Sequence, residues 1–362
     1  MKEQPPKKTI SSIESLHDTG KFNDYVQEIL NNSKYKSFWE TIEGSSQTSF
    51  LKNEEINKII NNYKEKLLFA DDINNTINTL QNEAKNLLNN YDENKDKSFN
   101  QIEVINRLKE TNHKLEKEKR LQTLLSQVNK DAGRKILEDD KFQELFLSTK
   151  RCFSFVLSID IRRSTELMLK ARSAELFEDF ITTLCTGLSE IIKKIFGIFD
   201  KFTGDGILSF YPDFYSGDES GLLAFKSAIE CHEFFNLFYE SNRKCFNSIL
   251  KGVGLGIGID CGEVHLAKIN SYTVIGPPVV YACRMSAAPA NTTYANQPAF
   301  EIFFNKYRDY VISTEKTINL KNEGKTVAYI LTPSDKELRV SPPNWNELTI
   351  KFGNVNNSNN QT

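Results

Sequence analysis

The chain is poor in the residues that build metal-binding fingers and disulfide frameworks. Its 362 residues include only four histidines and six cysteines. The cysteines stand singly, without a CxxC pair, and no two histidines have the spacing of metal ligands. We therefore expect buried thiols in a reducing compartment rather than disulfides or a zinc site.

Long apolar runs and an excess of charge are also missing. No run of about 18 apolar residues could span a bilayer, and the polar start of the chain does not resemble a signal peptide. The formal net charge is −2, so no general attraction to nucleic acid or to an anionic membrane is expected. These features indicate a soluble, cytoplasmic protein whose partners include neither nucleic acid nor membrane.

Glycine is nearly absent before residue 150, where the composition changes. Apolar residues recur there at helical spacing, which predicts helices within residues 1–148. The pattern fits a coiled coil and an antiparallel helical bundle equally well. We interpret the region as a sensor or dimerisation region, with a structural extension as the alternative. The positions that carry the pattern are Ile56, Ile60, Tyr63, Leu67, Ile73, Ile77, Leu80, Ala84, Leu87, Ile105, Leu108, Leu115, Leu121, Leu125 and Val128.

Strands and helices alternate over residues 149–335, and this alternation predicts an α+β domain. One of its helices is expected to start at Ser164 or Thr165, as the N-cap, and to end at Gly197. Residues 336–362 are interpreted as an extension that ends in an asparagine-rich, disordered tail.

Two aspartates stand where strands turn sharply. Asp160 ends the apolar run at 153–159, and Asp205 stands between Gly204 and Gly206 in a predicted hairpin turn. The glycines permit positive φ and keep Cβ atoms away from an approaching phosphate. Carboxylates at a hairpin tip and at a strand-to-helix turn can converge on divalent metal ions. The pair therefore suits chemistry on a triphosphate.

A later strand has glycine at alternate positions, Gly254, Gly256 and Gly258. These glycines remove the side chains from one face and predict close packing of another element there. A dinucleotide-binding loop is not favoured, because no helix opens after them. The next strand, around Thr273, leads to a helix that carries Arg284. A guanidinium there can hold the oxygens of a negatively charged transition state, with a surface salt bridge as the alternative.

In their order, these segments resemble the class III nucleotide cyclase domain, the family of adenylate and guanylate cyclases. The resemblance covers residues 150–332 and implies a ferredoxin-like βαββαβ core. The matching segments are Asp160-Ile161 before a Ser/Thr helix start, Lys201-x-x-Gly204-Asp205, Gly256-Ile257-Gly258-x-x-x-Gly262-Glu263-Val264, Tyr272-Thr273-Val274-Ile275-Gly276 before Ala282-Cys283-Arg284, and Leu320-Lys321-Asn322-Glu323-Gly324-Lys325 before Val327-Ala328-Tyr329-Ile330.

The resemblance implies which residues bind metal and phosphate. Asp160 and Asp205 are expected to ligate two Mg²⁺ or Mn²⁺ ions, with the carbonyl of Ile161 as a further ligand. Oxygen ligands suit these ions rather than zinc. The helix opening that contains Ser164 and Thr165 is expected to seat the β- and γ-phosphates.

The same resemblance assigns the base contacts and the assembly. Lys201 and Thr273 are expected to contact the base, and Arg284 to stabilise the pentavalent phosphorus as the ribose 3′-oxygen attacks and pyrophosphate leaves. In this family each site lies between two antiparallel domains, one giving the aspartates and the other the base pocket and the arginine. This chain carries both sets, which implies a homodimer with two equivalent sites. A nucleoside triphosphate is the implied substrate, and the cyclic product implies a downstream effector.

Two features bear on which nucleotide is used. Where the family has an asparagine four positions before Arg284, this chain has Val280. The segments 160–165 and 276–285 resemble a bacterial branch, the pyrimidine cyclases of the Pycsar antiphage system, which make cyclic CMP or cyclic UMP. A smaller base needs a contact that reaches further into the pocket, and Ser158, on the strand face of the first aspartate, is the candidate.

These observations give three candidate functions. The favoured one is a metal-dependent pyrimidine cyclase that produces a second messenger in bacterial antiphage defence. The first alternative is an adenylate cyclase in general signalling, because ATP-using relatives also show a Lys with Thr at the selector positions. The second is a non-catalytic nucleotide-binding regulator, because Val280 replaces the ribose-binding asparagine. The sequence does not separate CTP from UTP.

Overall fold

The structure is a computed structural model, in which all described residues belong to one compact unit spanning residues 62–362. It describes residues 74–83, 85–86, 98–268, 272–320 and 324–359. The helical positions expected at 56–73 and at residues 84 and 87 lie outside this part. Residues 74–83 and 85–86 are helical, as the spacing predicts.

The elements that directly precede the sheet are also helical, which confirms the predicted helices for the described residues. They are α4 Ser98–Gln127, α5 Lys130–Glu138 and α6 Asp140–Ser148. Side chains cap the two short helices: Asn129 Oδ1 accepts the Asp131 N–H at 2.8 Å, and Asp139 Oδ1 accepts the Phe142 N–H at 3.1 Å. The roles predicted for residues 1–148 and the domain boundaries stay predictions.

An eight-stranded sheet follows, with the order β2-β3-β1-β4-β6-β8-β7 and with β5 paired to β4. Its strands are β1 Arg151–Arg162, β2 Ile198–Phe202, β3 Gly206–Pro212, β4 Gly254–Lys268, β5 Tyr272–Ile275, β6 Thr292–Ala295, β7 Val311–Leu320 and β8 Gly324–Pro333. The pairs β2–β3, β3–β1 and β1–β4 are all antiparallel. With helices after β1 and after β3, this is the predicted ferredoxin-like βαββαβ core in an α+β fold.

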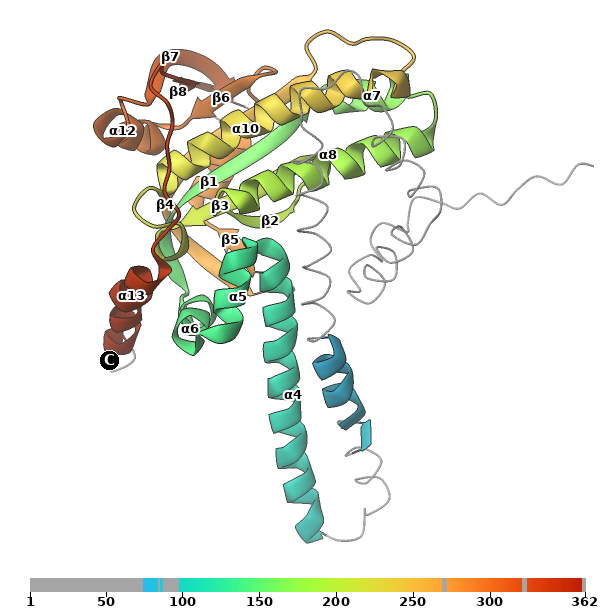
Figure 1. Ribbon diagram of the computed structural model, residues 1–362, viewed down its shortest axis with the longest axis vertical. Helices are drawn as coiled ribbons and strands as arrows, with labels where there is room; N and C mark the ends of the chain where they lie inside the picture. The colour runs from blue at the N-terminus through green and yellow to red at the C-terminus, as the bar shows by residue number, and fades with distance from the viewer. Residues whose placement is uncertain (1–73, 84, 87–97, 269–271, 321–323, 360–362) are drawn as a thin grey trace, which may run out of the picture. The chain divides into compact units, whose positions relative to one another are not determined.

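Helices cover the sheet on the face that carries the main core. The helices after β1 are α7 Ser164–Lys170, α8 Ala174–Lys194, α9 Asp213–Ser216, α10 Ser220–Ser241, α11 Pro277–Met285, α12 Gln297–Lys306 and α13 Trp345–Asn359, with a 3₁₀ turn η3 at Arg243–Cys245. α8 and α10 lie side by side over one face (Figure 1). Alternate residues of β1, from Phe155 to Ile161, point into the apolar core there.

The helix predicted from Ser164 to Gly197 is wrong in its details. The structure has two helices, α7 and α8, and Ser173 caps the second through its Oγ, which accepts the Leu176 N–H at 3.2 Å. The N-cap of α7 is Arg163, in a left-handed conformation with φ 64°, rather than Ser164 or Thr165. The side chain of Ser164 is engaged in the site described below, which is why it does not cap.

The disordered tail predicted from residue 354 is also wrong as far as residue 359, because α13 continues to Asn359. Contacts upstream of the asparagines hold this helix. Trp345 donates its indole N–H to the carbonyl of Tyr215 at 3.0 Å and stacks on the Tyr215 ring, and Leu348 is buried. A low-complexity end therefore extends a helix that starts in packed residues.

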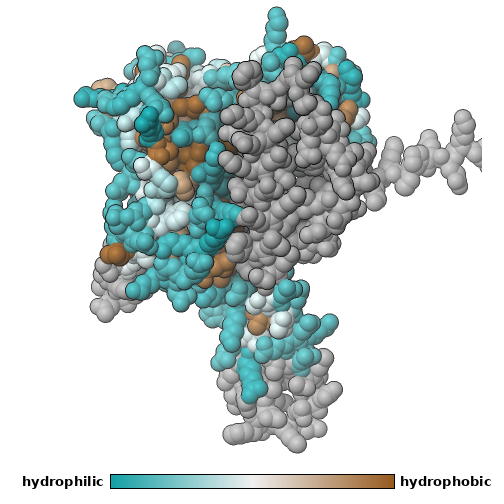
Figure 2. Space-filling model, viewed as in Figure 1, coloured by the Kyte–Doolittle hydropathy of each residue, from teal (hydrophilic) through white to brown (hydrophobic). Residues whose placement is uncertain are grey.

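The surface and the thiols fit the composition. In the view of Figure 2, the described residues at the surface are mainly hydrophilic, and the apolar residues lie in separate patches, as is usual for a water-facing surface. Among the described residues no helix is long and apolar enough to cross a membrane. All six cysteines are free thiols, and Cys185, Cys231, Cys245 and Cys261 are buried.

The glycines of β4 bring α11 against the sheet, as the sequence predicts. A Cβ on Gly258 would lie 2.0 Å from the carbonyl oxygen of Ala282 and 2.4 Å from the backbone nitrogen of Ser286. A Cβ on Gly256 would lie 2.4 Å from the carbonyl oxygen of Ser286. The last turn of the helix that carries Arg284 therefore rests directly on the β4 backbone.

We predict that Gly258→Ala lowers the free energy of unfolding by about 1–3 kcal/mol or more, because the added methyl group must push α11 away from the sheet. Gly353→Ala in α13 is the matched control, since within the described part of the chain no atom beyond its chain neighbours and its own helix backbone lies within 4 Å of the added Cβ. That control should leave stability unchanged or raise it slightly. Urea unfolding of both variants checks this, and an unchanged midpoint for Gly258→Ala would contradict the close contact.

Candidate functional site

Asp160 stands at the end of the β1–β3 ladder, on the face of β1 opposite the main core. Its register partners are Gly206 in β3 and Gly256 in β4. The guanidinium of Arg162, the next residue on the same face, donates to the Asp160 carboxylate. The glycine at 256 makes room for this arginine, because a Cβ there would lie 2.9 Å from Arg162 Cδ. The carboxylate is 34% exposed, so it is open to a ligand.

Asp205 reaches the same place from the turn between β2 and β3. Gly204 adopts φ 82°, and the N–H of Thr203 donates to the carbonyl of Gly206 at 2.9 Å, which closes the turn. A Cβ on Gly206 would lie 2.3 Å from the carbonyl oxygen of Ile159, so only glycine lets the turn approach β1 this closely. The hydroxyl of Ser164, at the start of α7, donates to the Asp205 carboxylate. The turn that carries Asp205 thus approaches the end of β1, and the negative charge of Asp205 acts on the Asp160 carboxyl group.

The electrostatics of the pair favour a cation. Burial raises the pKa of Asp160 above its ordinary value of 3.8, the nearby charge of Arg162 lowers it, and the negative charge of Asp205 raises it further. Each carboxylate accepts one charged or polar donor, from Arg162 and from Ser164 respectively. A divalent cation between them would offset the remaining negative charge.

The donor set also indicates the kind of cation. Within the described part of the chain, no three or more His, Cys, Asp or Glu side chains cluster as a metal site. Two carboxylates alone fit Mg²⁺, which usually keeps several waters and binds through one or two carboxylates together with substrate phosphates. The residues present therefore fit an oxygen-ligated ion that binds together with a phosphorylated ligand.

Ile161, Thr165 and Ser158 lie close to the pair along the chain, in different settings. Ile161 is the first β1 residue beyond the ladder with β3, and its side chain is buried in the main core. Thr165 is exposed in the first turn of α7. Ser158 is 3% exposed and its hydroxyl donates to Ser286 Oγ at 3.3 Å. This placement gives Ser158 a packing contact between β1 and the end of α11.

Lys201 and Thr273, the predicted base-contact pair, meet directly. Lys201 Nζ donates to Thr273 Oγ1 at 3.1 Å across the gap between β2 and β5. Lys201 is half exposed, while Thr273 is buried. The ammonium has three N–H donors and no acceptor. It can therefore donate to an acceptor on a ligand while one hydrogen bond holds it to the threonine.

Asp200, which the sequence reasoning missed, fixes this pair from behind. Its side chain is fully buried, and its Oδ2 accepts the Thr273 hydroxyl at 2.8 Å and the Val274 N–H at 3.4 Å. Its Oδ1 has no hydrogen-bond partner among the described residues, and burial raises its pKa. The sequence signal that could have identified Asp200 is an acidic residue directly next to Lys201. The irregular register between Phe199 and Lys201, which marks a bulge, could not be read from the sequence.

Arg284 is carried on α11, partly buried, with its guanidinium carbon 5.5 Å from the centre of the Tyr281 ring. This is a cation–π geometry, which orients the guanidinium. Val280, one turn earlier on the same helix, is 47% exposed. The described contacts of the aspartate pair come from β1, α7 and the β2–β3 turn, and those of the lysine–threonine pair from β2 and β5. Arg284 thus lies on α11, an element separate from those that supply either set of contacts.

Comparison with known proteins gives similarity to solved structures alone. No family model matches the chain, and no curated protein is similar to it. The adenylyl cyclase CyaB from P. aeruginosa is 22% identical, with a TM-score of 0.46, over 52% of this chain and 97% of that one. The guanylyl cyclase Cya2 is 21% identical, with a TM-score of 0.44, over 51% and 93%. The guanylate cyclase domain of RhGC from Catenaria anguillulae is 16% identical, with a TM-score of 0.40, over 51% and 99%.

We predict that the protein binds Mn²⁺ through the aspartate pair. Asp205→Asn should weaken Mn²⁺ binding at least about tenfold, because one of two charged ligands is lost. Asp335→Asn, at an exposed aspartate away from the pair, is the control. Electron paramagnetic resonance of free Mn²⁺ during a titration measures both. Equal affinity of Asp205→Asn and wild type would exclude the pair as the metal site.

Proposed function

We propose that this chain is a metal-dependent nucleotide cyclase that converts CTP or UTP into the 3′,5′-cyclic nucleotide and pyrophosphate. The observation that carries the proposal is the convergence of Asp160 and Asp205, from a strand end and a hairpin turn, on one partly open site. The product would be a second messenger in bacterial antiphage defence, read by a downstream effector.

The reaction requires one bond to form and one to break at the α-phosphorus. The ribose 3′-oxygen forms a bond to phosphorus, its proton passes to water, and the bond to the oxygen that bridges the α- and β-phosphates breaks. Two Mg²⁺ or Mn²⁺ ions bound at the site would neutralise phosphate charge and lower the pKa of the ribose hydroxyl. Asp160 and Asp205 would hold them, with the Ile161 carbonyl as a further ligand.

The start of α7 would receive the β- and γ-phosphates. Ser164 and Thr165 stand in its first turn, and the Arg163 backbone before them is held in the left-handed region. Backbone N–H groups at a helix start are suited to oxyanions. The hydroxyl of Ser164 already donates to Asp205, so the phosphate seat and the metal seat share one residue.

The lysine–threonine pair supports recognition of a base, although the chemistry of its donors does not by itself identify which base is preferred. Lys201 donates hydrogen bonds only, and cytosine, uracil and adenine all offer an acceptor. The preference for a pyrimidine rests on the resemblance of segments 160–165 and 276–285 to pyrimidine cyclases. Ser158, buried against Ser286, would act on the base through this packing rather than from an open surface.

We further propose a homodimer with two equivalent sites. Arg284 stands on α11, an element that supplies none of the described contacts of the aspartate pair. In an antiparallel dimer the arginine and the lysine–threonine pair of one protomer would face the aspartates of the other. Arg284 would then stabilise the negative charge that develops on the equatorial oxygens of phosphorus.

Two other functions remain as outcomes of the test. An adenylate cyclase would keep the same metal and arginine roles, and the Lys201–Thr273 hydrogen bond is compatible with adenine. A regulatory nucleotide-binding protein would be favoured by Val280, whose exposed apolar side chain cannot hydrogen-bond a ribose.

We predict that the purified protein with Mn²⁺ makes a cyclic pyrimidine nucleotide when it is given ATP, GTP, CTP and UTP separately. Asp160→Ala combined with Asp205→Ala should abolish the product, because the metal ligands are lost, while thermal unfolding shows a folded protein. Mass spectrometry identifies the products. Cyclic AMP as the main product would move the function to adenylate signalling, and full activity of the double variant would exclude the proposed site.

We predict complementation between inactive chains. Asp160→Ala and Arg284→Ala should each be inactive, and a 1:1 mixture allowed to exchange subunits should recover about a quarter of wild-type activity. That fraction follows because half of the dimers are mixed and each mixed dimer has one intact site. Activity of the mixture against each variant alone measures this, and no recovery despite proven exchange would contradict shared sites.

A further inference from the structure

The side chain of Gln127, the last residue of α4, is buried and saturated with hydrogen bonds. It is 3% exposed. Its two Nε2 N–H groups donate to the carbonyls of Phe199 at 2.8 Å, Asp200 at 3.1 Å and Tyr272 at 3.0 Å, so one N–H is shared between two carbonyls. Its Oε1 accepts the Tyr272 N–H at 3.2 Å. One carboxamide thus contacts three residues that lie 72 to 145 positions away in the chain.

These hydrogen bonds join two strands that the sheet leaves unjoined. β2 pairs with β3, and β5 pairs with β4, while no register pairs β2 with β5. An amide that both donates and accepts can replace a short piece of ladder between two backbones. Gln127 supplies that piece, as a bridge between the Asp200 carbonyl and the backbone of Tyr272.

The bridge lies directly beside the predicted base-contact pair. Asp200 precedes Lys201 on β2, and Tyr272 precedes Thr273 on β5. The hydrogen bond from Lys201 Nζ to Thr273 Oγ1, at 3.1 Å, crosses the same gap one residue further along each strand. The separation of β2 and β5 therefore sets whether the ammonium remains on the threonine or turns away.

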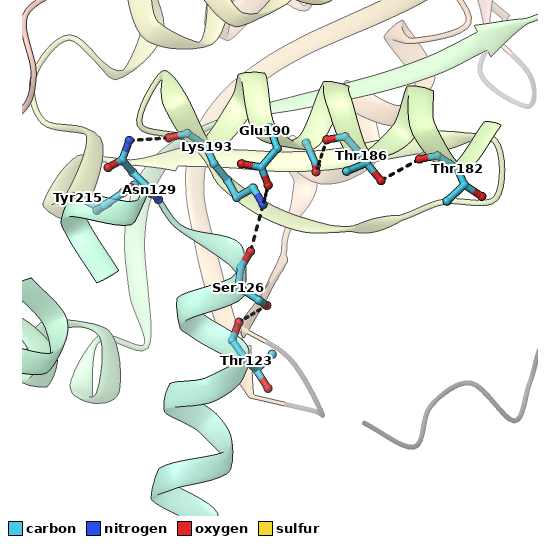
Figure 3. Close-up of polar contacts among 9 residues, drawn as sticks. Thr123, Ser126, Asn129, Thr182, Thr186, Glu190, Lys193 and Tyr215 are labelled. Atoms are coloured by element: carbon cyan, nitrogen blue, oxygen red, sulfur yellow. Dashed lines mark hydrogen bonds and ion pairs between the residues drawn. The ribbon is translucent and has the colours of Figure 1, made fainter. Parts of the chain in front are cut away.

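The end of α4 is itself held in place, so Gln127 has a fixed origin. In Figure 3, Lys193 of α8 reaches down to α4, where its Nζ donates to the carbonyl of Ser126 at 3.4 Å. Lys193 also forms a buried ion pair with Glu190. Asn129 donates to the carbonyl of Lys193 at 3.3 Å, and its own N–H donates to the hydroxyl of Tyr215 at 3.2 Å. Polar contacts on both sides of Gln127 thus fix the residue against the core.

We propose that Gln127 is a positioning residue that holds Lys201 against Thr273 and thereby sets which base the site accepts. The inference rests on the proposed function and adds a residue outside the segments that resemble a cyclase. Gln127 touches neither nucleotide nor metal, and acts through the spacing of β2 and β5. Without Gln127, three carbonyls and one N–H beneath the lysine–threonine pair lose a hydrogen-bond partner. Among the described contacts, β2 and β5 would then be joined by the side chains of Asp200 and Lys201, so their spacing could change.

The test compares Gln127→Ala with Gln143→Ala. Gln143 is the matched control, because it is a buried helical glutamine whose Nε2 donates to the carbonyl of Ile136 at 3.0 Å, within the α5–α6 region. We expect Gln127→Ala to reduce the ratio of kcat/KM for the preferred nucleotide over the next base at least about tenfold. Gln143→Ala should leave that ratio within about twofold, even where it lowers stability. Gln127→Met, which keeps the side-chain length without its polar atoms, replaces the alanine variant if that variant does not fold.

Hydrogen–deuterium exchange supplies a readout that does not depend on catalysis. Peptides covering 198–202 and 272–275 should exchange faster in Gln127→Ala than in Gln143→Ala at equal global stability. An unchanged nucleotide ratio, with or without faster exchange, would overturn the inference, as would a wild-type protein without base preference.

If wild type makes no product from any nucleotide, the proposed function fails and the inference is judged on binding. The ratio of affinities for the preferred and the next nucleotide is then measured by equilibrium dialysis of the four triphosphates with Ca²⁺. A ratio that changes in Gln127→Ala alone would uphold the positioning role in a binding protein, and a ratio that does not change would overturn it.

Discussion

Close contact between backbones at three glycines is the constraint on which the site depends. Gly206 lets the β2–β3 turn approach β1, and Gly256 and Gly258 let α11 lie on β4. A side chain at any of them would have to occupy space that is already filled by a carbonyl oxygen or a backbone nitrogen. Two elements distant in sequence are thereby brought to one face of β1, where Asp160 stands. The absence of side chains there is what allows functional side chains to meet.

The two faces of β1 divide stability from chemistry. One face carries Phe155, Leu157, Ile159 and Ile161 into the core beneath α8 and α10. The other face carries Val156 in a second apolar cluster and then the polar residues of the site: Ser158 donates to Ser286 at the end of α11, and Asp160 accepts from Arg162 of the same strand. Because strand residues alternate in direction, both demands can be met by one strand without conflict. Asp160 is therefore held on a strand, while Asp205 is supplied by the β2–β3 turn.

Local sequence patterns predicted those features that depend on neighbouring residues. The apolar run before Asp160, the Gly204-Asp205-Gly206 turn and the alternate glycines of β4 each state a backbone requirement, so the convergence of the aspartates and the approach of α11 could be expected. The assignment of Lys201 and Thr273 as base contacts came from resemblance to a family. The hydrogen bond between them was not predicted, since nothing local joins positions 72 residues apart.

What could not be predicted depends on tertiary context. No interruption in the helical pattern of the sequence marks the break between α7 and α8. Similarly, α13 continues into a segment whose composition is typical of disorder. The bulge that buries Asp200 shifts a strand by one residue, which no alternation of residue types reveals. The burial of Gln127 could not be predicted, because its hydrogen-bond partners are backbone groups, which carry no sequence signal.

These unpredicted residues change how the helices before the sheet are understood. A structural extension would contact the sheet through apolar side chains that tolerate small shifts, since such contacts are not directional. The end of α4 has apolar contacts through Leu121 and Leu124, and it also meets β2, β5 and α8 through hydrogen bonds beside a buried ion pair, which fix both distance and angle. Apolar packing of α5 and α6 surrounds this contact. A displacement of α4 would therefore reach the lysine–threonine pair through Gln127, because its carboxamide contacts the backbone of both strands that carry the pair.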